Sequence, residues 1–181
     1  MKELSMHILD IVMNSVKAEA SLIELKIVDS IKNNKLIISI KDDGRGMDEE
    51  TLKQVINPFF TTRSTRKVGL GIPMLKEACE RCNGQFNIYS EVGIGTTVES
   101  VFERNNIDRA PLGNMGDTIM TIINSLNDCE LLYIHETDLD IFEFSTVKIK
   151  EILDGVSIKN SDVILWIKDF VNENTIKLYQ N

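Results

Sequence analysis

Residues 35–47, KLIISIKDDGRGM, combine a strand pattern with a polar glycine loop. Leu36, Ile38 and Ile40 alternate with other residues, which predicts a half-buried strand. The loop 42–47 follows at once; its glycines let the backbone approach a flat ligand, and a carboxylate at the strand end can accept a hydrogen bond from an exocyclic amine. On its own the loop also fits a type I′ turn or half of a metal loop, although the acidic spacing of an EF-hand is missing.

The segments around this stretch predict an α/β (α+β) fold built as a two-layer sandwich. An amphipathic helix over residues 3–20 comes first, and a turn at 32–34 joins two strands into a hairpin. The predicted elements that complete this region are the strands 22–28 and 35–41, a helix from 48 to about 55, a loop over 58–71, a helix over 72–82, and the strands 85–89 and 96–102. This order fits one sheet with the helices on one of its faces.

A polar segment closed by a proline, residues 105–111, predicts a boundary between domain 1–105 and a small α+β region, 106–181, of unknown function. The predicted elements of the second region are a helix over 117–126, strands at 130–135 and 141–144, and helices over 146–153 and 161–172. Because this region is small, we expect it to dock on the first domain or on a partner.

Composition narrows the class of protein. The 181 residues are 43% hydrophobic and 27% charged, which is ordinary for a globular chain. A net charge of −8 argues against a nucleic-acid partner, and no stretch approaches the roughly 20 apolar residues of a membrane helix, so we expect a cytoplasmic protein with no membrane partner. Cys79, Cys82 and Cys129 are expected to be reduced, packed thiols, because the C-x-x-C spacing lacks the second Cys/His pair of a metal site.

Three polar residues share one face of the first helix. Asp10, Asn14 and Lys17 are spaced i, i+4 and i+7, beside an apolar stripe. An amide oxygen suits Mg²⁺, lysine suits phosphates, and Asp10 can act as a general base. The alternative interpretation is a solvated helix face with chance spacing.

In the segment 57–72, NPFFTTRSTRKVGLGI, residues 58–71 show no sustained period and are interpreted as a long functional loop. Gly69 and Gly71 open the next helix, so backbone N–H groups and the helix dipole face an anion, which suits a triphosphate. Three basic residues accompany them: Arg63, Arg66 and Lys67. The segment 93–98, GIGTTV, is a glycine turn into a strand whose threonines could contact a base, and a simple hairpin turn also explains it.

Together, in this order, the four segments resemble the N, G1, G2 and G3 boxes of the Bergerat-fold (GHKL) ATPases and kinases, over about residues 3–103. The resemblance implies ATP with Mg²⁺ as cofactors, Asn14 as the Mg²⁺ ligand, Asp42 as the acceptor for the adenine amine, and Asp10 and Lys17 as catalytic residues. The other implied nucleotide contacts are Gly44, Gly46 and Met47 on the adenine side, Phe60, Thr61, Thr62, Arg63, Arg66, Lys67, Val68, Gly69, Leu70, Gly71 and Ile72 in and after the ATP lid, and Thr96 as a second base contact.

The sequence departs from the family's patterns at two of these places, one in the sensor kinases and one in the ATP-hydrolysing members. Lys67 stands where such kinases usually have the first glycine of G-T-G-L-G, giving a short, basic lid that equally resembles the anti-sigma-factor serine kinases. Asp10 is one methylene shorter than the glutamate of the ATP-hydrolysing members.

The ATP domain begins almost at the first residue, which leaves no room for a preceding dimerisation helix pair with a phosphorylatable histidine. We therefore expect a stand-alone histidine- or serine-kinase-like protein that acts in trans on a phosphoacceptor protein. An ATP-hydrolysing conformational switch and a non-catalytic nucleotide-binding module are the alternatives. ATP and ADP are the expected small-molecule partners, and homodimerisation stays open.

Overall fold

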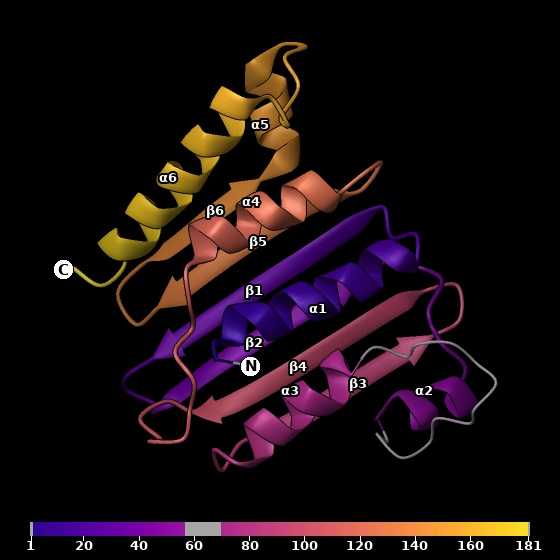
Figure 1. Ribbon diagram of the computed structural model, residues 1–181. Helices are drawn as coiled ribbons and strands as arrows, with labels where there is room; N and C mark the ends of the chain where they lie inside the picture. The colour runs from indigo at the N-terminus through magenta and orange to yellow at the C-terminus, as the bar shows by residue number, and fades with distance from the viewer. Residues whose placement is uncertain (1, 57–69, 181) are drawn as a thin grey trace.

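A single six-stranded mixed sheet organises the computed structural model, which describes residues 2–56 and 70–180 (Figure 1). The strand order is β3-β4-β2-β1-β5-β6. The strands are β1 (Leu22–Ser30), β2 (Lys35–Asp42), β3 (Gln85–Glu91), β4 (Gly95–Glu103), β5 (Glu130–Thr137) and β6 (Ile141–Ser145). The helices are α1 (Leu4–Lys17), α2 (Glu49–Ile56), α3 (Gly71–Glu80), α4 (Met115–Ser125), α5 (Thr146–Leu153) and α6 (Ser161–Lys177).

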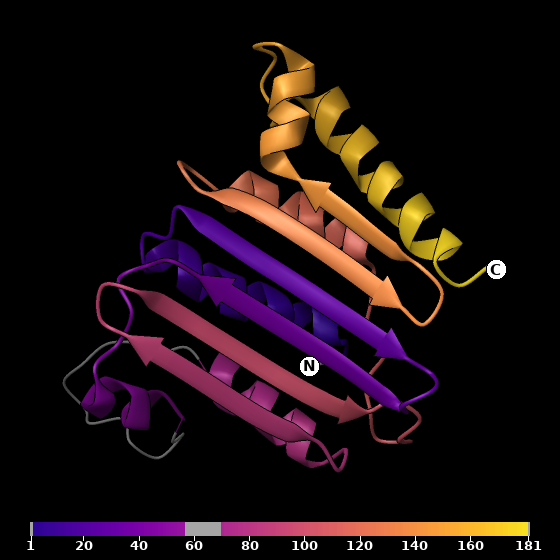
Figure 2. The same cartoon turned by 180° about the vertical axis from the view of Figure 1, so that it is seen from behind.

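The predicted two-layer sandwich is confirmed. Helices α1, α3 and α4 lie on one face of the sheet, and the opposite face carries no helix in the described chain (Figure 2). Ile23, Leu25 and Ile27 alternate along β1 and are completely buried under the helical layer. Their partners on the helix side include Ile8 and Val12 of α1, so the apolar stripe of α1 is the centre of the core.

Strand register brings the polar ends of two strands together. β2 pairs antiparallel with both β1 and β4, and Asp42 lies opposite Thr96 at the end of the β2–β4 ladder. The carboxylate that ends β2 and the threonine at the start of β4 therefore lie side by side at the same end of the sheet, next to the C-terminal end of α1.

The region after residue 105 extends the same sheet. β5 pairs in parallel with β1, and β6 pairs antiparallel with β5 at the outer edge. Helix α4 packs against α1 and α6 in the helical layer. The expected docking on the first domain thus takes the form of continuous strand pairing, while the division at residue 105 stays a prediction.

Two helix ends differ from the sequence prediction by at least three residues. α1 ends at Lys17 rather than residue 20, because Glu19 adopts a left-handed φ of 59° and the chain turns into β1. α6 runs to Lys177 rather than 172. Asn172 accepts a hydrogen bond from the Gly116 backbone and Asn174 donates to the Phe170 carbonyl, so both amides have partners within the longer helix.

A chain of polar groups, which runs from the buried Tyr133 and His135 to the partly exposed Tyr179, fastens the C-terminal segment to β1. The Tyr179 hydroxyl donates to Asp29 at 2.9 Å and lies 3.0 Å from His135 Nε2, while His135 Nδ1 lies 2.8 Å from the Tyr133 hydroxyl. Since the single Tyr179 hydrogen goes to Asp29, His135 donates from Nε2 and accepts from Tyr133 at Nδ1. Asp29 in turn is paired with Arg104.

Burial of His135 makes stability depend on pH. The side chain is fully buried, and desolvation lowers its pKa from 6.5 to about 4 against the opposing charge of Asp29. Because the unfolded chain then binds a proton first as the pH falls below 6.5, the free energy of unfolding should decrease between pH 6.5 and 4. Chemical denaturation of His135→Gln should show this decrease reduced by about 2 kcal/mol relative to the unmodified chain.

Tyr179→Phe is the matched control for that experiment. It removes one hydroxyl from the chain of polar groups but leaves His135 to titrate, so it should lower stability by about 1 kcal/mol at pH 7 and keep the pH dependence. Identical pH profiles for His135→Gln and the unmodified chain would contradict the assignment.

Candidate functional site

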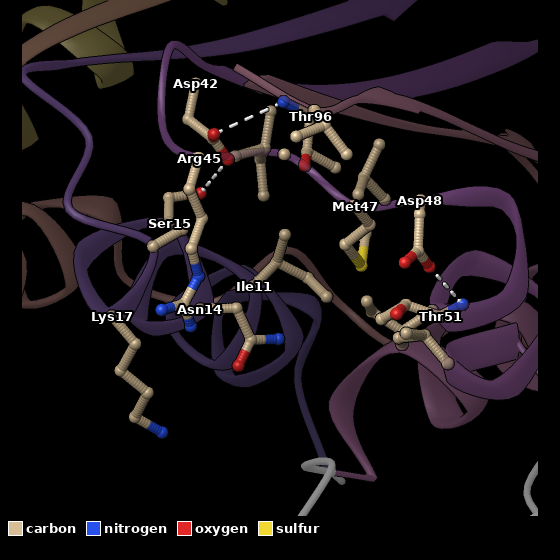
Figure 3. A pocket seen from close by; sticks show the side chains of 17 residues that line it. Ile11, Asn14, Ser15, Lys17, Asp42, Arg45, Met47, Asp48, Thr51 and Thr96 are labelled. Atoms are coloured by element: carbon tan, nitrogen blue, oxygen red, sulfur yellow. Dashed lines mark hydrogen bonds between the residues drawn. The ribbon is translucent and has the colours of Figure 1, made fainter. Parts of the chain in front are cut away.

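A pocket of about 520 Å³ opens beside the C-terminal end of β2, an interior strand of the sheet (Figure 3). Its wall is formed by the C-terminal half of α1, the loop after β2, α2, the start of α3 and the start of β4. The residues that line it are Ile11, Asn14, Ser15, Lys17, Ala18, Ile40, Asp42, Arg45, Gly46, Met47, Asp48, Thr51, Val55, Ile72, Val92, Thr96 and Val98. The lining is mostly apolar, with a few polar groups, as in sites for flat organic ligands.

The Asp42 carboxylate is the most strongly positioned polar group of the pocket. It is only 7% exposed, and Oδ1 accepts from the backbone N–H groups of Gly44 at 3.0 Å and Thr96 at 3.2 Å. Oδ2 accepts from the Ser15 hydroxyl at 2.6 Å. A carboxylate has about four lone-pair positions, so one position of Oδ2 remains for a donor in the pocket.

The neighbouring Asp43 has a different role. Its carboxylate accepts from the backbone N–H groups of Ser21 and Leu22 and from the Ser21 hydroxyl, which fastens the turn between α1 and β1. The Ser21 hydroxyl is also the main reason why the pKa of Asp43 lies below its usual value. Of two adjacent aspartates, only Asp42 lines the pocket.

Two glycines allow the loop after β2 to pack against the β3–β4 hairpin. Gly46 has φ 66°, and a Cβ there would lie 1.9 Å from the Glu91 carbonyl oxygen. Gly95 has φ 130°, and a Cβ there would lie 2.0 Å from the Asp42 carbonyl oxygen. Any side chain at either position would push the two segments apart and widen the pocket.

Helix α1 contributes the other predicted polar residues. Asn14 is half-buried and Lys17 is exposed, and both line the pocket. Asp10, on the same helix face one turn earlier, is exposed and does not line it. A Cβ on Gly71 would lie 2.8 Å from the Asp10 Cβ, so Asp10 stands beside the first residue of α3, where the predicted lid ends.

The predicted nucleotide contacts fall into three groups. Met47, Ile72, Gly46 and Thr96 line the pocket. Gly44 is buried beneath it, where a Cβ would lie 2.8 Å from the Ala18 carbonyl oxygen, and Leu70 and Gly71 lie at the start of α3 outside the lining. The lid residues Phe60, Thr61, Thr62, Arg63, Arg66, Lys67, Val68 and Gly69 lie outside the described residues.

Several lining residues were missed by the sequence reasoning. Ser15 offered a signal, because it is a hydroxyl within the apolar stripe of α1. Arg45 lies between the two glycines of the loop, and no role was assigned to it from the sequence. Asp48 and Thr51 line the pocket from the start of α2, where the Thr51 N–H donates to the Asp48 carboxylate at 2.7 Å as a helix cap.

The histidines and cysteines lie apart from the pocket. His7 is 3% exposed and His135 is fully buried, and neither lines the pocket. All three cysteines are buried and unpaired; Cys79 donates to the Gln85 and Val101 carbonyls, and burial raises its pKa to about 11. The burial agrees with the expected packing of these side chains.

Two features are absent from the described part of the chain. Within residues 2–56 and 70–180, no three His, Cys, Asp or Glu side chains are grouped so that they could hold a metal ion. In the same part of the chain, no helix is long and apolar enough to cross a membrane.

Comparisons with known proteins agree with this geometry. The family model for the histidine kinase-, DNA gyrase B-, and HSP90-like ATPases matches residues 2–106. A putative sensor protein of Shewanella frigidimarina is 33% identical over 103 residues, which are 56% of this chain and 16% of that protein. The sensor histidine kinase YvrG of Bacillus subtilis is 32% identical over 95 residues, which are 50% of this chain and 16% of the kinase. The chain therefore spans 16% of the length of each of these relatives.

A solved structure shares the fold over a longer range. The Aquifex aeolicus MutL ATPase domain complexed with ADP superimposes with a TM-score of 0.52 at 15% identity, over 85% of this chain and 70% of that chain. The family model covers the helix α1, the loop after β2 and the β3–β4 hairpin that together enclose the pocket. The chain belongs to the histidine kinase-, DNA gyrase B- and HSP90-like ATPase family, whose model matches it over residues 2–106.

Proposed function

We propose that ATP enters this pocket with its adenine amine against Asp42. The observation that carries the proposal is the remaining acceptor position of the buried Asp42 carboxylate, whose other positions are filled by Ser15, Gly44 and Thr96. A buried carboxylate that is held on three sides accepts from an amine without reorganising. The apolar side chains of Met47 and Ile72 line the same pocket and suit the faces of a purine.

Asn14 and Lys17 are proposed to meet the phosphate end of the nucleotide. Asn14 supplies an amide oxygen inside the pocket, and Mg²⁺ takes few protein ligands when phosphates and water supply the rest. The residue therefore fits the ion, which would neutralise the phosphate charge when bound. Lys17, about one turn further along α1, adds a positive charge on a flexible side chain that also lines the pocket.

The first candidate activity is phosphoryl transfer to a partner protein. The relatives include a sensor histidine kinase, and the two histidines of this chain are both buried away from the pocket. A phosphoacceptor on another protein fits these facts better than His7 or His135. Asp10 would remove the proton of the attacking group from its exposed position beside the start of α3.

The second candidate is an ATP-hydrolysing switch. The contact of Asp10 with Gly71 favours it, because a change at the lid end of α3 acts directly on α1. Helix α1 also packs against α4, the first helix of the region after residue 105. Closure over a γ-phosphate could then change how residues 106–181 meet a partner.

Asp42→Asn tests the adenine contact. Replacing the carboxylate should lower ATP affinity roughly 10- to 100-fold, because a charged acceptor for the amine is lost. Isothermal titration calorimetry with ATP measures the effect, and thermal unfolding of the variant shows that it is folded. The same change one residue on, Asp43→Asn, should keep ATP affinity within about twofold, because Asp43 faces the turn at Ser21. Equal losses in the two variants would count against this orientation of the base.

Asn14→Ala tests the magnesium assignment. Mg²⁺ should strengthen ATP binding by the unmodified chain about tenfold or more and should have little effect on the variant, because the amide ligand is gone. Asn105→Ala, at an exposed position far along the chain, is the control with the same side-chain loss. A variant that keeps the full Mg²⁺ effect would exclude Asn14 as the ligand.

Asp10→Asn separates turnover from binding. With γ-labelled ATP and Mg²⁺, phosphate release or labelling of a partner should fall by about 100-fold or more, since the general base is neutralised, while ATP affinity changes little. Unchanged turnover in the variant would remove Asp10 from the mechanism. Tight ATP binding without turnover in the unmodified chain would favour a nucleotide-sensing module.

A further inference from the structure

The backbone of Arg45 is held on both sides. Its N–H donates to the Ala18 carbonyl at the end of α1 at 2.9 Å, and its own carbonyl accepts from Gly93 in the β3–β4 hairpin at 2.8 Å. The residue therefore bridges two elements that enclose the pocket. These two hydrogen bonds fix the backbone position from which the Arg45 side chain extends.

The side chain of Arg45 lines the pocket together with Asn14 and Lys17. Figure 3 shows it running from the Asp42 end of the pocket toward these two residues of α1. Among the residues that the structure describes, neither Arg45 nor Lys17 lies within ion-pair distance of a carboxylate. In the described part of the chain, two cations that line one pocket thus have no carboxylate partner, although the net charge of the chain is −8.

The two acidic residues that line the pocket accept hydrogen bonds from groups other than Arg45 and Lys17. Asp42 accepts from Ser15, Gly44 and Thr96, and Asp48 caps α2 through Thr51. A guanidinium with no carboxylate to pair with presents a planar set of donors to an anion that enters the pocket.

We propose that Arg45 binds the phosphate chain of the nucleotide and so makes the pocket select adenosine phosphates over adenosine. This inference rests on the proposed ATP site, and adds to it a specificity-determining contact from the adenine-side loop. The base fixed at Asp42 and the magnesium ligand at Asn14 define the two ends of the nucleotide. The Arg45 side chain lies along the path between them.

Arg45→Gln is the direct test, with adenosine, AMP, ADP and ATP titrated separately by calorimetry. Affinity for ADP and ATP should fall about tenfold or more, as for loss of a charge-assisted hydrogen bond, while adenosine affinity should stay within about twofold. Arg45→Lys should recover part of the loss, because it keeps the charge but not the planar fork.

Lys41→Gln is the matched control. It removes one positive charge four residues earlier, from an exposed side chain of β2 that does not line the pocket. Its four affinities should equal those of the unmodified chain at 0.15 M salt, where distant surface charges are screened.

The outcomes separate this inference from the proposed function. Equal loss for adenosine and ATP in Arg45→Gln would show that Arg45 shapes the base pocket, and unchanged affinities would show that it does not contact the nucleotide; either result overturns the inference and leaves the ATP site standing. Failure of the unmodified chain to bind any of the four ligands would overturn both.

Discussion

The buried carboxylate of Asp42 is the constraint on which the site depends. An ionised group in an apolar wall is costly unless it is hydrogen-bonded, so its position is stable only while its donors stay in place. The donors come from α1 through Ser15, from the loop through Gly44 and from β4 through Thr96. One carboxylate thus holds together three segments separated by up to 81 residues in the sequence.

The same constraint explains why glycines recur in two distant segments. The Thr96 N–H reaches Asp42 only if the start of β4 approaches the backbone at the end of β2. That approach leaves no space for a Cβ at Gly95, and the loop beside it leaves none at Gly46. The glycines of the G1-like and G3-like segments therefore serve mutual packing as much as contact with a ligand.

Much of this arrangement could be predicted from residue patterns. Alternation in β1 and β2 and the helical period of α1 identified the core layers, because each element buries one regular face. Asp42 could be singled out because it ends a buried strand. The separate role of Asp43 could not be predicted, because the turn that Asp43 fastens depends on the three-dimensional path between α1 and β1. Ser15 was grouped with the apolar stripe, although its hydroxyl is the donor that fixes Asp42.

Local sequence patterns could not predict that β5 pairs with β1. Parallel pairing links residues more than 100 positions apart, and alternation in β5 predicts a strand without naming its neighbour. The same holds for the polar chain from Asp29 to Tyr133, whose members come from β1, β5 and the C-terminal segment. Side chains that meet only through topology leave no spacing signal in the sequence.

These two attachments determine how a change in the pocket could reach residues 106–181. The strand pairing along β1 and the Tyr179–Asp29 contact fix β5 and the C-terminal segment to the sheet, and Asp29 lies at the opposite end of β1 from the pocket. The sheet is therefore a rigid link. Helix α1 is different, because it lines the pocket at its C-terminal half and packs against both α3 and α4. A shift of α1 over the sheet would change its contacts with α4 without breaking a strand ladder, so the proposed switch would act through the helical layer.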